Sequence, residues 1–149
     1  GAFTVDLRPG SYFLYLLDGT GTHREGFAGP PTTVTVTDRA ATAVNPTMSP
    51  TRGAFSGTVT DQRTGLAVAG AMVFAIGPPG IVGRAVAGAN GQYTLSGLTS
   101  GTYHAVFLDP VGGRAAEYYP NSVDYGGSAP INVVAGATTP GVDGSLTHP

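Results

Sequence analysis

Histidines are the first candidates for catalytic groups, because imidazole is the side chain whose ordinary pKa lies nearest to neutral pH. The sequence has three, His23, His104 and His148, together with only two glutamates, Glu25 and Glu117. His104 follows an inward-facing tyrosine in an alternating stretch, so it is expected to point to solvent, and His148 is expected to fray. No Gly-x-Ser-x-Gly turn is present to position a nucleophile, and there is no cysteine. The sequence therefore predicts neither an active site nor a zinc site, and we expect a protein that is not an enzyme.

Aspartates in turns are the candidates for a calcium site, because Ca²⁺ takes several carboxylate and carbonyl oxygens. Asp109 and Asp124 are the better placed of them. The alternative is structural, since an Asp side chain readily accepts hydrogen bonds from the backbone N–H groups of its own turn. No EF-hand loop or calcium-binding nonapeptide repeat occurs in the sequence. The structural interpretation is preferred, and no cofactor is predicted.

A cluster of tyrosines is the candidate ligand site. Sugars are recognised by flat aromatic faces flanked by a few hydrogen-bonding groups, and one short segment holds such residues: Tyr118, Tyr119, Asn121 and Tyr125. The alternative is that these rings pack in the core or at a sheet edge. Both interpretations stay open, with packing preferred.

The composition favours short strands joined by many turns. The 149 residues include 24 glycines and 12 prolines, yet 41% are hydrophobic, which is too apolar for a disordered chain. The formal net charge is −2 and all seven cations are scattered arginines, so no patch for nucleic acid or an anionic membrane is predicted. No apolar run approaches the roughly 20 residues of a membrane-spanning helix, so no membrane insertion is expected.

Period-two alternation dominates the sequence and predicts an all-β chain. The run from Ala71 to Ile76 is continuously apolar and predicts a central strand, and Asn90-Gly91 is typical of a two-residue hairpin turn. The first part of the chain has four predicted strands, near residues 2–7, 11–17, 33–37 and 41–48. The second part has eight, near residues 54–60, 71–76, 81–87, 92–96, 102–109, 115–119, 130–134 and 138–146.

An internal repeat organises these strands. Residues 1–18 align with residues 91–109 after one insertion, and residues 34–37 and 41–48 align with residues 131–134 and 138–146. Paired residues include Phe3 with Tyr93, Gly10 with Gly101, Tyr12 with Tyr103, and Asp18 with Asp109. The alignment also pairs Phe27 with Tyr119 and Gly26 with Tyr118, which favours a packing role for Tyr119.

Residues 53–90 have no counterpart before Gly1, so the first copy reads as the C-terminal half of a β-sandwich module. We predict this half module at residues 1–48, a proline-containing linker at 49–53 and a complete module at 54–147. The beginning of the chain reads as mid-domain, typical of an excerpt or a processed chain. The half module is expected to be completed either by upstream sequence or by a neighbouring subunit.

Two segments carry a family resemblance: Gly57-Thr-Val-Thr-Asp61 with Thr64-Gly65 and Val68–Val73, and Ala89–Tyr103. Together they resemble the carboxypeptidase regulatory-like domain, a transthyretin-like (prealbumin-like) Greek-key β-sandwich, and its Cna-B-like neighbours. The resemblance implies a module of a secreted enzyme or a bacterial surface protein, located outside the cell. Cna-B-like modules often form a Lys isopeptide bond, which a chain without lysine cannot make.

The preferred function is a non-catalytic extracellular structural or adhesive repeat, forming a fibre or surface layer by strand complementation between subunits. Its expected partners are copies of itself or neighbouring repeats. The alternative is a carbohydrate-binding or accessory module of a secreted hydrolase, with polysaccharide as the partner. The sequence leaves open the ligand, the organism and any O-glycosylation of threonines.

Overall fold

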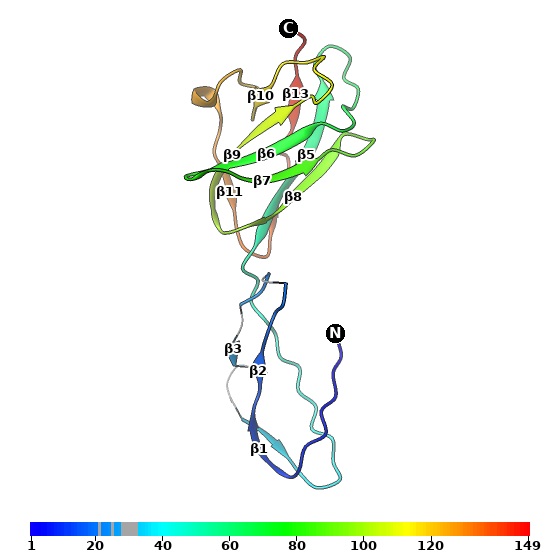
Figure 1. The fold of residues 1–149 in the computed structure, drawn as a ribbon, viewed down its shortest axis with the longest axis vertical. Helices are drawn as coiled ribbons and strands as arrows, with labels where there is room; N and C mark the ends of the chain where they lie inside the picture. Colours follow the sequence, from blue (N-terminus) through cyan, green and yellow to red (C-terminus); the bar gives the residue numbers. More distant parts are fainter. Residues whose placement is uncertain (21, 25, 28–32) are drawn as a thin grey trace. The chain divides into compact units, whose positions relative to one another are not determined.

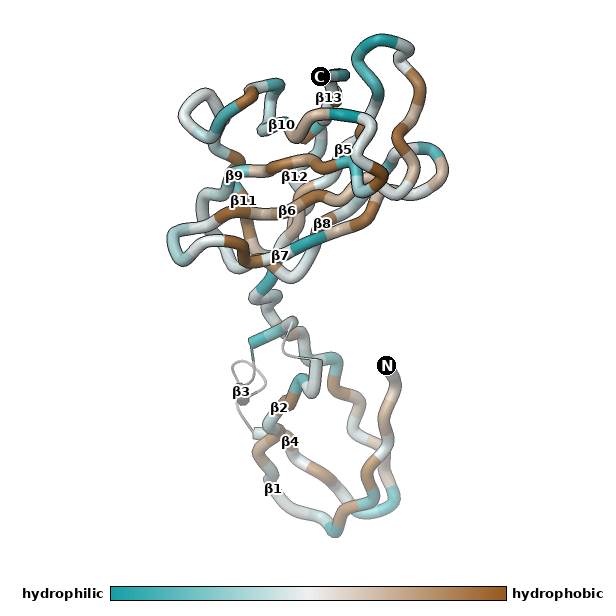
Figure 2. Tube along the Cα trace, turned by 45° about the horizontal axis from the view of Figure 1, so that its top comes forward, coloured by the Kyte–Doolittle hydropathy of each residue, from teal (hydrophilic) through white to brown (hydrophobic). Residues whose placement is uncertain are grey.

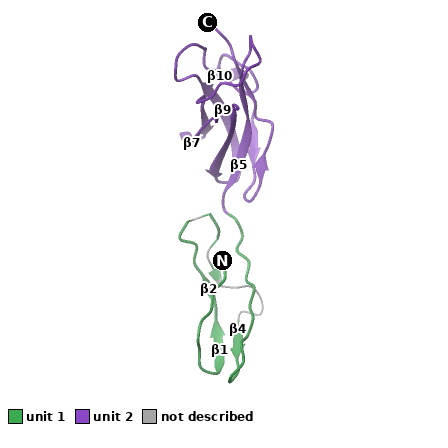
Figure 3. Cartoon of the chain, turned by 90° about the vertical axis from the view of Figure 1, so that its right-hand side faces the viewer, with its two compact units in different colours: residues 1–50 green, residues 51–149 purple. Residues whose placement is uncertain are grey.

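The computed structural model describes residues 1–149 except 21, 25 and 28–32, and it divides the chain into two compact units. Unit 1 is residues 1–50 and unit 2 is residues 51–149 (Figure 3). The described part of the chain is all-β, with one short 3-10 turn at Tyr125–Gly127, as the alternation predicts. It contains no helix of the length and apolarity needed to cross a bilayer.

Unit 2 is a sandwich of two sheets (Figure 1). The first sheet is built on β5 (Gly53–Asp61), which pairs antiparallel with β8 (Gln92–Leu98) and parallel with β12 (Thr138–Thr139) and β13 (Gly144–Leu146). The second sheet runs in the order β10-β9-β6-β7, and β11 also pairs with β9. Its strands are β6 (Met72–Gly77), β7 (Gly80–Val86), β9 (Gly101–Leu108), β10 (Glu117–Tyr118) and β11 (Ile131–Val133).

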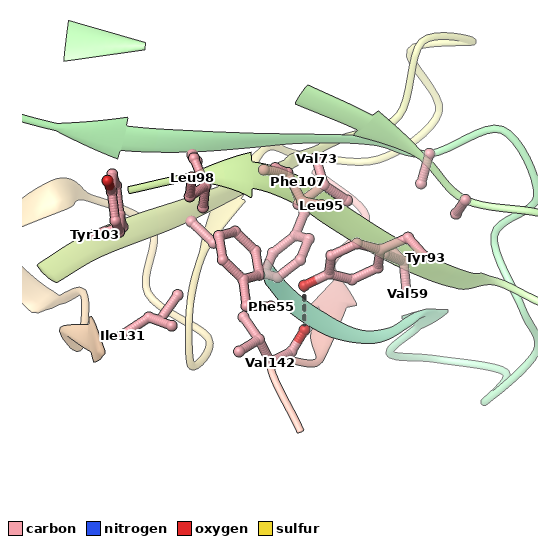
Figure 4. Packing of buried hydrophobic residues seen from close by; sticks show 14 of the residues in the cluster. Phe55, Val59, Val73, Tyr93, Leu95, Leu98, Tyr103, Phe107, Ile131 and Val142 are labelled. Carbon is pink, nitrogen blue, oxygen red and sulfur yellow. Dashed lines mark hydrogen bonds between the residues drawn. The ribbon is translucent and has the colours of Figure 1, made fainter. Parts of the chain in front are cut away.

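The core of unit 2 lies between these sheets. Tyr93 from β8 is its centre: its ring meets Phe55 of β5 and Phe107 of β9 edge to face, with centroids 6.2 and 6.1 Å apart (Figure 4). Its hydroxyl donates to the carbonyl of Val142, as the dashed line in Figure 4 shows. Burial raises the pKa of this phenol. A large aromatic side chain with a satisfied polar end therefore ties both sheets to the segment that leads into β13.

The run from Ala71 to Ile76 forms the central strand that was predicted. β6 lies between β7 and β9, and hydrophobic residues are frequent along both β6 and β9 (Figure 2). Val73 and Ala75 are fully buried in the core, whereas Phe74 on the opposite face is only half-buried. The outer face of this sheet is therefore apolar and partly open.

The hairpin predicted at Asn90-Gly91 is wrong. The flanking strands β7 and β8 belong to different sheets, so this turn carries the chain from one layer to the other. Only Gly91 has a positive φ, 75°, and its N–H donates to the carbonyl of Gly88. A type I′ turn would need positive φ at both central residues. The observed hairpin joins β6 to β7 through Pro78 and Pro79, and Gly80 there has a φ of 114°.

Unit 1 is less regular. It has β1 (Gly10–Phe13) paired with β4 (Thr33–Val36), and β2 (Tyr15–Leu16) paired with β3 (Gly26–Phe27). The strands predicted at 2–7 and 41–48 are not formed. Their counterparts in unit 2 are β8 and the β12–β13 segment, all of which pair with β5. The described part of unit 1 has no equivalent of β5, so these two segments lack the strand that would order them.

Hydrogen bonds recur at the positions that the sequence alignment pairs. The Tyr12 hydroxyl donates to the Arg8 carbonyl at 2.8 Å, and Tyr103 donates to Thr99 at the same distance. The registers correspond as well, because Tyr12 faces Val34 across β1–β4 as Tyr103 faces Ile131 across β9–β11. A third pair links loops to strands: Thr42 donates to the Thr35 carbonyl and Thr139 to the Asn132 carbonyl. The two units thus share these hydrogen bonds and this register as well as sequence.

The units differ in burial. No described residue of unit 1 is buried, and Val5 is 63% exposed, whereas its counterpart Leu95 is 0% exposed. Phe3 is 54% exposed against 5% for Tyr93. Burying one such side chain contributes about 1.5–3 kcal/mol. Unit 1 therefore lacks several stabilising contributions of this size.

Close packing around β5 leaves no room for a side chain at Gly57. A Cβ on Gly57 would lie 2.0 Å from the Val142 carbonyl oxygen, so Gly57→Ala must displace backbone. We expect it to lower the free energy of unfolding by about 1–3 kcal/mol in urea denaturation of the full chain. Gly101→Ala is the control, because the nearest atom to its Cβ is 3.8 Å away. Equal effects of the two substitutions would contradict this packing.

Candidate functional site

A buried ion network lies where β5 ends. Asp61 is 2% exposed, and its Oδ2 accepts from Arg114 Nε at 2.8 Å and from His148 Nε2 at 2.9 Å. The Arg114 Nη1 donates to Asp109 Oδ2 at 2.9 Å, so one guanidinium joins two carboxylates. Asp61 Oδ1 accepts the backbone N–H groups of residues 63 and 64 in the following turn. The network pins this turn, the end of β9 and the last residues of the chain together.

The same contacts explain the pKa values of the two carboxyls. The hydrogen bond from Arg114, with the turn N–H groups, holds the pKa of Asp61 well below its ordinary value, against the opposing effect of desolvation. The Val111 N–H and then Arg114 lower the pKa of Asp109. Both carboxyls are therefore ionised and paired at neutral pH. A fixed, satisfied pair of this kind serves structure rather than proton transfer.

The two calcium candidates lie in separate local turns. One carboxylate oxygen of Asp109 already accepts a hydrogen bond from the Arg114 guanidinium. Asp124 accepts the Gly127 N–H at 2.9 Å and caps the 3-10 turn. Asp18, the counterpart of Asp109, likewise accepts the Thr20 N–H at 2.9 Å. Among the described residues, no three His, Asp or Glu side chains gather as metal ligands would. The contacts are those of turn-forming aspartates.

The histidines are also dispersed. His104 is half-buried rather than directed to solvent: its Nδ1 lies 2.7 Å from Ser128 Oγ. His148 contacts Asp61, so the fraying expected there is wrong. His23 lies in unit 1, with its Nδ1 3.2 Å from Asp18 Oδ2. Arg114 was missed entirely at the level of sequence, because a single arginine among scattered ones gives no signal of the carboxylates it will join.

An aromatic cluster forms on the outer face of the β9–β10 sheet. The Tyr125 ring lies 6.1 Å from Tyr118, edge to face, and 4.8 Å from the His104 ring. Tyr125 is 50% exposed, whereas Tyr118 is half-buried. Apolar residues lie next to the cluster across the sheet, because Tyr118 pairs with Val106 and Val106 pairs with Phe74. The arrangement is an aromatic surface that includes two tyrosine hydroxyls and an imidazole.

The other two candidate residues lie differently. Tyr119 packs against the hydrophobic core, which is consistent with the packing role preferred from the alignment. Asn121 is exposed, with a φ of 151°. The strand pairing corrects the alignment of Phe27 with Tyr119. Phe27 pairs with Tyr15, and Tyr118 pairs with Val106, the counterpart of Tyr15. Tyr118, not Tyr119, is thus the structural counterpart of Phe27.

Comparison with known proteins identifies a family and a distant structural neighbour. Residues 54–140 match the sequence profile of the carboxypeptidase regulatory-like domain. No curated protein sequence matches the chain. A solved structure of a proposed carbohydrate-binding protein from Bacteroides uniformis is similar with a TM-score of 0.42 and 14% identity, over 62% of this chain and 40% of that one. The chain spans less than half the length of that protein, and a similarity of this degree carries no functional inference.

The ion network predicts acid sensitivity. The folded pKa values of Asp61 and Asp109 lie below the unfolded value of about 3.9, so their contribution to stability is present above about pH 4. It is lost as the pH falls through the lower folded values. We expect Arg114→Met to be less stable than the natural chain at pH 7, with the difference shrinking toward pH 3. Urea unfolding at several pH values measures this. The exposed Arg63→Met is the control, and an undiminished difference at pH 3 would contradict the assignment.

Proposed function

The chain belongs to the carboxypeptidase regulatory-like domain family, and from this premise we propose that it is a non-catalytic structural or adhesive repeat of an extracellular protein. The observation that carries the proposal is the recurrence of equivalent contacts in both units, such as the Tyr12–Arg8 and Tyr103–Thr99 hydrogen bonds. Repeated modules that share one geometry are suited to building extended arrays. The extracellular location rests on the family resemblance.

Assembly is the second part of the proposal. Unit 1 exposes apolar side chains whose counterparts in unit 2 are buried, and its segments 2–7 and 41–48 lie outside any ladder. Unpaired strand segments with an apolar face favour addition of further strands. Neighbouring repeats, including the open unit 1 segments of other subunits, associate by strand addition at these edges and give a fibre or a surface layer.

Solution mass tests the assembly. Light scattering of the full chain across a hundredfold range of concentration is expected to show a mass that rises with concentration. Val5→Asp places a charge among the exposed apolar groups and is expected to reduce the association. Thr35→Asp is the matched control, because Thr35 is exposed in unit 1 and its counterpart Asn132 is exposed in unit 2. A constant monomer mass for the natural chain would rule out the assembly and leave a single bead or binding module.

The aromatic cluster supports a second candidate function, a carbohydrate-binding or accessory module of a secreted hydrolase. The half-exposed Tyr125 ring, beside Tyr118 and His104, offers a stacking face together with polar groups. Aromatic rings of this kind supply contact area at low entropic cost in binding sites. Polysaccharide would be the partner of this surface.

A polysaccharide-binding assay distinguishes the two functions. If the cluster binds sugar, Tyr125→Ala and Tyr118→Ala are each expected to weaken binding by about tenfold or more, as loss of a central aromatic contact does. Tyr15→Ala is the control, because it removes an exposed tyrosine from unit 1. Equal binding by all four proteins, or binding by none, would exclude the cluster as a sugar site.

A further inference from the structure

Unit 1 contains a groove of about 850 Å³. It is lined from both of the segments that form no strand, with apolar side chains from residues 2–7 and from 41–48 and a floor on β4: Phe3, Val5, Leu7, Val34, Val36 and Val44. In the described part of the chain no strand pairs with either of these two segments. The groove is therefore bordered by two segments of backbone, and residues 3–7 and 37–44 line it.

Unit 2 shows what fills the equivalent space. There β5 lies between β8, antiparallel to it, and β12–β13, parallel to it. Phe55 on β5 pairs with Leu95 on one side and with Thr139 on the other. The counterparts of these two partners in unit 1 are Val5 and Thr42. One strand between 2–7 and 41–48 would thus restore both ladders at once.

We propose that the groove of unit 1 is an acceptor for a single β-strand with the pattern of residues 53–61, supplied by a repeat other than unit 2. The inference rests on the proposed structural function and names the partner of its open unit. The incoming strand runs antiparallel to 2–7 and parallel to 41–48, with its first large apolar residue between Val5 and Thr42. At the next inward position it carries glycine, because a Cβ on Gly57 would meet the carbonyl of Val142, the counterpart of Val44.

The numbers of donor strands and acceptor sites in each copy of the chain exclude unit 2 as the donor. Each copy of residues 1–149 carries one β5 and two acceptors, one in each unit. Exchange of β5 between copies fills one acceptor by emptying another, so one acceptor per copy stays open. Exchange therefore creates no additional ladder, and a donor with a strand to spare is needed.

A peptide copying residues 51–62 is the probe, added to the full chain. We expect one peptide to bind per chain, and amide hydrogen exchange to slow in 2–7 and 41–48. A second peptide, in which Phe55 exchanges places with Ser56 and Thr58 with Val59, has the same composition but presents its apolar residues on the opposite face. It is expected to bind at least about tenfold more weakly.

Variants of the full chain locate the site. Val5→Asp is expected to abolish binding of the first peptide, and Thr35→Asp, at a residue that does not line the groove, to preserve it. No binding, equal binding of the two peptides, or protection confined to unit 2 would each overturn the proposal. A chain that associates on its own but ignores the peptide leaves the structural function standing and removes the acceptor. A monomeric chain that binds the peptide does the reverse, keeping the acceptor and removing self-assembly.

Discussion

The architecture of the chain depends on one strand with two neighbours of opposite direction. β5 pairs with β8 on one side and with β12 and β13 on the other, so the first sheet of unit 2 exists only around it. Where β5 is present, its neighbours form ladders and the core closes. In the described part of unit 1, where it has no equivalent, the corresponding segments form no strand and their apolar side chains stay exposed. The two units show the same sequence pattern with and without the stretch that contains β5, β6 and β7.

Close approach of backbones makes β5 specific rather than merely apolar. Gly57 lies against the Val142 carbonyl, and Gly144 lies against the ring of Phe107, so neither position has room for a side chain. Tyr93 reaches across the core to donate to that same Val142 carbonyl. Gly57 on β5, Gly144 on β13 and the large Tyr93 in the core therefore fix the position of the segment that leads into β13. Packing of this kind selects partners by shape, which hydrophobicity alone does not.

Much of the fold could be predicted from the sequence, because strand alternation and the family motif are local signals. The all-β sandwich and the central position of the 71–76 strand followed from them. The role of Asn90-Gly91 did not, since turn chemistry fixes a local backbone without saying which sheet receives the next strand. Nor did the network around Arg114, whose partner Asp61 lies 53 positions away in the sequence. Tyr125 and Tyr118 were picked out as aromatic residues, but the contribution of His104 to their surface required the fold.

The parallel pairing of β5 with β13 also bears on how unit 2 would respond to mechanical load. β5 starts at Gly53 and β13 stops at Leu146 beside the far end of β5, so tension applied at these two points pulls the strands past each other along their length. Their hydrogen bonds are then loaded together in shear instead of opening one after another like a zipper. The Asp61–Arg114–Asp109 pairs and His148 anchor the same end. A covalent cross-link is thus not the only route to tensile strength in such a domain.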